Sequence, residues 1–113
     1  MTESILTSVK QFLGPAEAYD HFDPAIIMEI NTALARLRRL GVGPSEGFVI
    51  HDATAVWSDF TQDIDEMADI KSYVCYKVKL TFDPPTSSAY TETLKENIRE
   101  LEFLLNVDAE TPV

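Results

Sequence analysis

Three short tracts that contain glycine or proline divide this chain into stretches whose apolar residues recur every three or four positions. They are Gly14-Pro15, Gly41-Val42-Gly43-Pro44 and Asp83-Pro84-Pro85. Proline cannot continue a helix because it lacks a backbone N–H, and glycine readily adopts the left-handed conformation that ends one. Helical periodicity between such breaks predicts an all-α chain.

Four stretches present one apolar face each at helical spacing. The first spans residues 3–13, and the second runs from Asp23-Pro24, where the carboxylate can cap the helix, to Gly41. The third begins at Asp63, and the fourth follows N-cap candidates at residues 86–88. The faces comprise Ile5, Leu6, Val9, Phe12 and Leu13; Ile27, Ile30, Leu34 and Leu37; Met67, Ile70, Val74 and Val78; and Tyr90, Leu94, Ile98, Leu101 and Leu105.

Residues 41–56 interrupt this pattern. Their glycine and proline content excludes a helix, and so long a loop in a compact domain is usually functional or mobile. Residues 57–60 are long enough for one helical turn. We therefore predict a small four- to five-helix bundle with one long irregular loop after the second main helix. The helical domain is expected to span residues 1–105, and a flexible C-terminal tail residues 106–113.

The chain is strongly acidic, with 9 Lys and Arg against 19 Asp and Glu and a net charge of −10. Such a chain repels DNA phosphates and anionic membranes, although an acidic surface also simply keeps a protein soluble. No apolar run approaches the roughly 18 residues of a membrane span. The first residues show no signal-peptide pattern, and the single cysteine excludes an internal disulfide. We expect synthesis in the cytoplasm and no membrane association.

No arrangement of residues indicates catalysis or a cofactor. His21 and His51 lie in no motif with serine or cysteine, so we interpret both as ordinary loop or surface histidines. Cys75 lies between apolar neighbours in the third helix, which is typical of a buried, inert thiol. Glycine motifs for phosphate or dinucleotide binding are absent. We predict that the chain is not an enzyme and uses no cofactor.

The densest group of potential metal ligands is Asp63, Asp65, Glu66 and Asp69. A calcium loop starting at Asp63 would need glycine at its sixth position and glutamate at its twelfth, where this sequence has alanine and valine. Carboxylates are favoured in the first turn of a helix because they face its positive end. We therefore interpret the group as a helix start and predict no metal.

Two further groups of residues have two interpretations each. Arg36, Arg38 and Arg39 close the second helix, where Arg36 and Arg39 share a face. They pair with carboxylates of this chain or of a neighbouring one, or they contact DNA. Trp57 and Phe60 flank the irregular segment, and they either form a satellite core beneath it or anchor a subunit interface.

The aromatic residues of the last two helices also have two interpretations. In one interpretation the four helices form a self-contained core. In the other, some of Tyr73, Tyr76, Tyr90 and Phe103 stay exposed in a single chain and are buried against a second copy.

Several short segments, spread over nearly the whole chain, mark structural breaks rather than chemistry. The most specific are Gly41-Val42-Gly43-Pro44, Trp57-Ser58-Asp59-Phe60 and Asp83-Pro84-Pro85. Others are the opening helix from Ser4 to Lys10, His21-Phe22-Asp23, the second helix from Pro24 with Asn31, Gly47-Phe48, Ile70-Lys71-Ser72-Tyr73-Val74, Lys77-Val78-Lys79-Leu80, Ser87-Ser88-Ala89, Glu100-Leu101-Glu102-Phe103 and Leu105-Asn106-Val107.

With these segments the chain resembles the head–tail connector, or adaptor, proteins of long-tailed bacteriophages and prophages of Gram-positive bacteria. The resemblance implies a virion protein that forms a ring of about twelve copies between the portal and the tail or stopper proteins. That ring would enclose the DNA exit channel, which DNA passes without specific binding.

The resemblance also suggests which parts of the chain touch other subunits. It implies docking through residues 41–56 and 106–113. The residues that we expect at a subunit or portal interface are Arg36, Arg39, Phe48, Trp57 and Phe60.

The acidic composition leaves one competing hypothesis. A small acidic protein-binding module, such as an inhibitor or DNA mimic, would carry its acids on one convex face and occupy the basic groove of another protein. A connector is distinguished from it by assembly into a ring.

Overall fold

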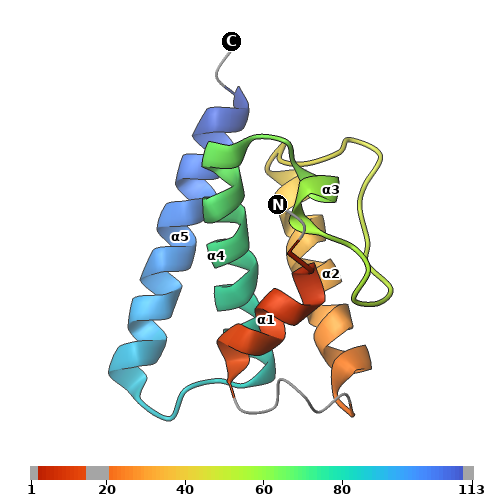
Figure 1. Cartoon of the computed structure of the whole chain (residues 1–113). Helices are drawn as coiled ribbons and strands as arrows, with labels where there is room; N and C mark the ends of the chain where they lie inside the picture. Colours follow the sequence, from red (N-terminus) through yellow and green to blue (C-terminus); the bar gives the residue numbers. More distant parts are fainter. Residues whose placement is uncertain (1–2, 15–20, 111–113) are drawn as a thin grey trace.

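The computed structural model describes residues 3–14 and 21–110, and these residues form five α-helices (Figure 1). The predicted all-α fold, with its long irregular segment after the second main helix, is confirmed. Within the described residues, the single piece of β pairing is an isolated bridge between Ser4 and Val56. The helices are α1 (Ile5–Leu13), α2 (Asp23–Arg39), α3 (Trp57–Phe60), α4 (Ile64–Phe82) and α5 (Ser88–Glu110).

Helix α4 is the centre of the molecule and packs against each of the other four helices. In Figure 1, α5 and α2 lie on opposite sides of α4, and α1 crosses in front of α4 and α2. The residues of α4 that face these neighbours are fully buried, among them Ile70, Val74 and Val78. Burying such aliphatic side chains is the main source of stability in a domain of this size.

Side-chain caps fix the starts of three helices. Ser4 Oγ accepts the Thr7 N–H at 3.2 Å at the start of α1. Asp63 Oδ1 accepts two backbone N–H groups at the start of α4, at 3.0 and 3.2 Å, so the predicted start is confirmed. Ser87 Oγ accepts the Tyr90 N–H at 3.2 Å before α5. Each cap satisfies an N–H group that has no partner inside its helix.

The predicted cap of the second helix was wrong. Asp23 is the first residue of α2, Phe22 occupies the N-cap position, and no side chain caps this end. The Asp23 carboxylate instead reaches Lys10 Nζ of α1 at 2.8 Å. Both side chains of this pair are largely buried, so the ion pair ties the start of α2 to α1.

Helix α5 is longer than the sequence indicated. A free tail was expected from residue 106, but α5 continues to Glu110. Leu105 is fully buried, and Asn106 Nδ2 donates to Leu40 O at the end of α2 at 3.1 Å. These contacts extend the folded part past the predicted boundary, and residues 111–113 of the expected tail lie outside the described residues.

Candidate interaction surfaces

The irregular segment begins with a tight helix end. Gly41, at φ +87°, follows α2, and its N–H donates to Arg38 O at 3.0 Å. The Val42 N–H reaches Leu37 O at 2.9 Å, which completes the Schellman arrangement of a helix C-terminus. Val42 is buried, so the segment 41–56 leaves α2 in a fixed direction.

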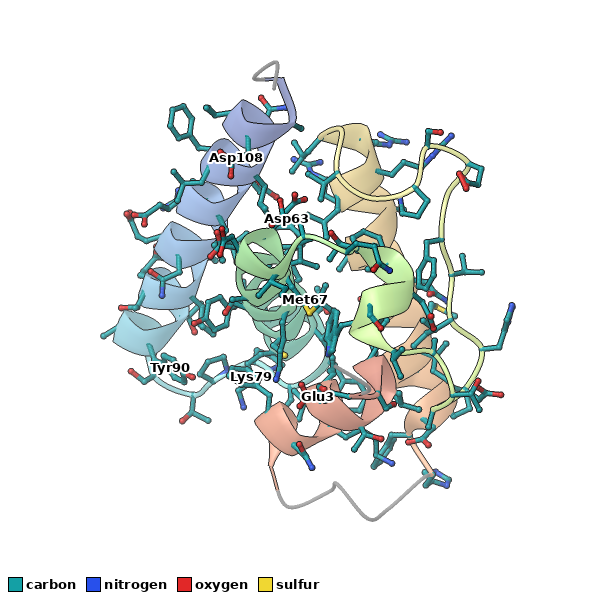
Figure 2. The ribbon with its side chains drawn as sticks, turned by 45° about the horizontal axis from the view of Figure 1, so that its top comes forward. Glu3, Asp63, Met67, Lys79, Tyr90 and Asp108 are labelled. Atoms are coloured by element: carbon teal, nitrogen blue, oxygen red, sulfur yellow. The ribbon has the colours of Figure 1, made fainter. Side chains whose placement is uncertain are left out.

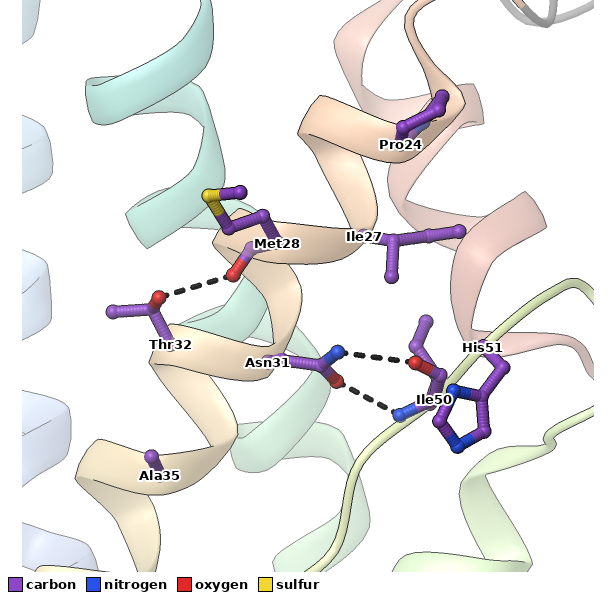
Figure 3. A pocket seen from close by; sticks show the side chains of 8 residues that line it. All are labelled: Pro24, Ile27, Met28, Asn31, Thr32, Ala35, Ile50 and His51. Atoms are coloured by element: carbon purple, nitrogen blue, oxygen red, sulfur yellow. Dashed lines mark hydrogen bonds between the residues drawn. The ribbon is translucent and has the colours of Figure 1, made fainter.

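One side chain of α2 holds the far half of this segment. Asn31 Nδ2 donates to Ile50 O at 3.0 Å, and Asn31 Oδ1 accepts the Ile50 N–H at 2.8 Å (Figure 3). The Asn31 amide thus forms the two hydrogen bonds that a neighbouring strand would otherwise provide to the Ile50 backbone. With the Ile50 side chain buried, the segment is pinned against α2 while His51 stays exposed beside it.

The two aromatic residues of α3 lie inside the subunit. Trp57 is 1% exposed, and its Nε1 donates to Ser8 Oγ of α1 at 3.1 Å. Phe60 is also buried and meets the half-buried Phe48 edge-on, with ring centroids 5.4 Å apart. These contacts place Trp57 and Phe60 in the core beneath the segment 41–56. A part for Phe48, Trp57 and Phe60 in a subunit interface stays a prediction.

The three arginines at the end of α2 have different surroundings. Arg36 Nε lies 3.6 Å from Glu102 Oε2 of α5, and the same carboxylate oxygen accepts the Tyr73 hydroxyl at 2.7 Å. Burial, and then this hydrogen bond, raise the pKa of Tyr73 well above its usual range. Arg38 Nε donates to the Ser45 carbonyl at 2.9 Å. Arg39 is exposed and forms no salt bridge with any side chain that the structure describes.

Carboxylates crowd the end of the molecule where α4 begins and α5 ends. Asp63 and Asp108 mark this end in Figure 2. Partial burial, followed by the charges of Asp63, Asp108 and Asp69, raises the pKa of Glu66. Within the described ranges, no group of three or more His, Cys, Asp or Glu side chains is arranged to hold a metal ion. The carboxylates at this end of the molecule therefore repel one another.

The other candidate reactive side chains are the cysteine and the two histidines. Cys75 is buried, and burial raises the pKa of its thiol to about 11, so the thiol stays protonated and unreactive at neutral pH. His21 and His51 are both exposed, which confirms their interpretation as surface histidines.

Helix α5 carries large apolar side chains on its outer side. Phe103 is 67% exposed, and Leu104 and Val107 are each more than 40% exposed. Of the four aromatic residues considered for exposure, Tyr90 and Phe103 are exposed, Tyr76 is half-buried and Tyr73 is buried. The core is complete without Phe103, Leu104 and Val107, so α5 presents an apolar surface to its surroundings.

A hollow lies along the outer side of α2, beside the pinned segment. Met28, Thr32 and Ala35 line its helix side, with Ile50 and His51 opposite (Figure 3). A second hollow continues it over Thr32 and Ala35 to the end of the helix. The small side chains at positions 32 and 35 allow another helix to approach closely.

Comparison with known proteins identifies the family of this chain. A family model described as Phage connector protein matches residues 5–112. The chain belongs to this phage connector family. The search of curated proteins and the search of solved structures each returned no match.

Membership in the phage connector family confirms the resemblance to head–tail connectors and gives the chain a structural role in a phage particle. A connector binds other head or tail proteins of the phage. In the part of this connector protein that the structure describes, no helix is both long and apolar enough to cross a membrane.

Sequence reasoning missed the outer side of α5 in this connector protein. It singled out Phe103 but neither Leu104 nor Val107. A signal was available, because the buried stripe of Leu94, Ile98 and Leu105 leaves positions 103 and 107 on the opposite side of a helix with 3.6 residues per turn.

Proposed function

We propose that this connector protein forms a ring between the portal and the tail or stopper proteins of a phage particle, around the channel through which DNA leaves the head. The observation that carries the proposal is the exposed apolar side of α5 on a subunit whose own core is complete. Apolar surface of this kind on a structural protein marks a contact with another chain. In a closed ring, every copy buries this apolar surface against a neighbouring chain.

The charge of the chain supports passage of DNA through the ring. A net charge of −10 repels phosphates, so DNA moves past without the Lys and Arg contacts that would hold it. The working location is the head–tail junction of the virion, after synthesis in the cytoplasm of the host. The resemblance to proteins of phages from Gram-positive bacteria supports a host from that group.

Docking to the portal and to neighbouring subunits is assigned to residues 41–56 and 106–113. Within the segment 41–56, the side chains of Glu46 and Val49 are exposed and free to contact another protein. The hydrogen bonds of Asn31 hold the same segment against α2 at Ile50. Trp57 and Phe60 act on this contact by fixing the position of the segment from beneath, whereas Arg36 and Arg39 lie at the surface.

A phage that cannot make this chain provides the test. Electron microscopy of its lysate should show separate heads and separate tails, and adding the purified protein back should join them. Joined, infectious particles without the chain would contradict the proposal. A host-directed acidic inhibitor would instead leave particle assembly unchanged.

A further inference from the structure

Arg38 and Arg39, at the end of α2, form no salt bridge with a described side chain, although the chain has an excess of ten acids. Of the nine lysines and arginines, six form salt bridges within the described residues. The other three are Arg38, Arg39 and Lys77, and the first two are adjacent and exposed. Arg38 donates to the Ser45 carbonyl but, like Arg39, has no carboxylate partner among the described side chains. Ion pairs are readily available in so acidic a chain, so two such arginines indicate an acidic partner outside the subunit.

Arg39 stands at one end of a continuous column along α2. Met28, Thr32, Ala35 and Arg39 are spaced by four, three and four residues, which places them on one side of a helix. All four are exposed, and Met28 is 67% exposed. Arg38 lies about 100° round the helix from Arg39, where its Nε donates to the Ser45 carbonyl. We call the column the arginine face and include Arg38 with it. It combines an apolar residue, a shallow hollow over two small side chains, and a cationic end.

Helix α5 carries a face of matching chemistry. Phe103, Leu104 and Val107 are exposed on its outer side, and Glu100 and Asp108 lie one turn before and one turn after Leu104. Both carboxylates are exposed, and neither forms a salt bridge with a described residue. We call these five residues the acidic face. The acidic face has protruding apolar side chains between two carboxylates. The arginine face has a hollow next to two cationic side chains.

The two faces cannot meet within one subunit. Glu102 and Asn106 of α5 point toward α2, as their contacts with Arg36 and Leu40 show. Leu104 is two residues from each of them, and two residues turn a helix by about 200°, so Leu104 points away from α2. α5 and α2 also lie on opposite sides of α4 (Figure 1).

We propose that the acidic face of one subunit packs against the arginine face of the next subunit. Phe103 would enter the hollow over Thr32 and Ala35, while Glu100 and Asp108 pair with Arg38 and Arg39. A contact between two different faces is head-to-tail, and repeated head-to-tail contacts close into a ring when the rotation allows. The inference rests on the proposed ring and specifies which surfaces form it.

A second copy of the chain fits the arginine face better than DNA does. DNA would satisfy the two arginines, but it would leave Met28 and the small-residue hollow uncovered and would do nothing for the exposed side of α5. A second copy covers both apolar surfaces at once, and it brings carboxylates to the arginines in a chain where carboxylates are abundant.

Two charge-reversed variants test the pairing. One carries Arg38→Glu and Arg39→Glu, and the other carries Glu100→Lys and Asp108→Lys. Each is mixed with the portal protein of the same phage, and ring formation is followed by light scattering and negative-stain microscopy. The matched control carries Lys95→Glu and Arg99→Glu. It changes the net charge as much as the arginine variant does, on exposed positions of α5 outside the acidic face.

Each reversed variant alone should lose ring formation by at least about tenfold, because like charges then face each other. An equal mixture of the two variants should restore rings. In the mixture, the reversed arginine face meets the reversed acidic face, and the two unchanged faces meet at the next contact. The control should assemble like the natural chain, and circular dichroism should show all variants folded.

Four results would overturn the proposal. Rings from either reversed variant alone would exclude this pair of faces while leaving the ring function standing. Loss of rings that the mixture does not restore would assign the arginines to the portal or to DNA. Equal loss in the control would show a response to net charge alone. Absence of rings from the natural chain would overturn both this inference and the proposed function.

Discussion

At the scale of single residues, Gly43 shows how the turn after α2 depends on the absence of a side chain. Its φ is +89°, a conformation that favours glycine. A Cβ placed at this position would overlap the ring of Phe60. The turn therefore brings the backbone directly onto the core, and the segment 41–56 starts from that contact.

Substituting Gly43→Ala should lower the free energy of unfolding by about 2–4 kcal/mol, because backbone strain adds to displacement of the Phe60 ring. Urea denaturation measures this loss. Gly14→Ala is the matched control, since Gly14 also has a positive φ but a Cβ added there would meet no atom within 4 Å. Equal losses in the two variants would show that the Phe60 contact contributes nothing.

Glu66 gives a prediction about pH. Its folded-state pKa is raised above the ordinary value of 4.5, so the charged form disfavours the fold at neutral pH. Glu66→Gln should therefore stabilise the protein at pH 7, by roughly a few tenths of a kcal/mol after solvent screening. The gain should shrink as the pH falls through the folded-state pKa and vanish below the ordinary value of 4.5, where the carboxyl becomes protonated in both states.

Thermal unfolding across this pH range checks the prediction. Glu46→Gln removes an exposed carboxylate from the irregular segment and serves as the control. A stabilisation by Glu66→Gln that stays constant from pH 7 to pH 4 would contradict an electrostatic cause.

At the scale of elements, the connection between α2 and the irregular segment depends on one amide. Asn31 supplies both hydrogen bonds of the Ile50 backbone. Asn31→Ala should leave that N–H and C=O without partners and lower the free energy of unfolding by about 1–3 kcal/mol. Faster hydrogen exchange at Ile50 would locate the effect.

Thr32→Ala is the control for Asn31→Ala. Thr32 is exposed on the same helix, and its hydroxyl donates to the Met28 carbonyl within α2. Its loss should change stability little. Unchanged exchange at Ile50 in the Asn31 variant would show that the segment is held elsewhere.

The sequence was sufficient to predict the helices because their signals are local. Apolar periodicity, the breaks at Gly41 and Pro84 and the cap at Asp63 all act within a few residues. The end of α5 was missed because it depends on Asn106 reaching α2, a contact between distant parts of the chain. The Asp23 cap failed for the same reason, since Lys10 of another helix binds that carboxylate.

The candidate surfaces were predicted less well than the helices. Periodicity identifies which side of a helix is apolar, but exposure depends on which helices arrive to cover it. Tyr73 and Phe103 were considered together, yet packing of α5 buries Tyr73 and leaves Phe103 exposed. The sequence places the three arginines together at the end of α2, but the separate partners of Arg36 and Arg38 follow from tertiary structure.

At the scale of the whole molecule, a complete small core coexists with two uncovered outer sides on α2 and α5. The described fold measures 42 × 34 × 21 Å along its principal axes, so it is a flat unit with these sides on different edges. Such a unit has a core of its own and still has surface left for neighbours. This combination is what a subunit of an assembled ring requires.

The most direct test of this account is the mass of the purified chain, measured by light scattering over a range of concentrations, alone and with the portal protein of the same phage. A ring-forming connector should give a closed assembly of many copies, either in free solution or on the portal. A chain that remains a monomer of 12.7 kDa at every concentration, with no binding to the portal, would contradict it.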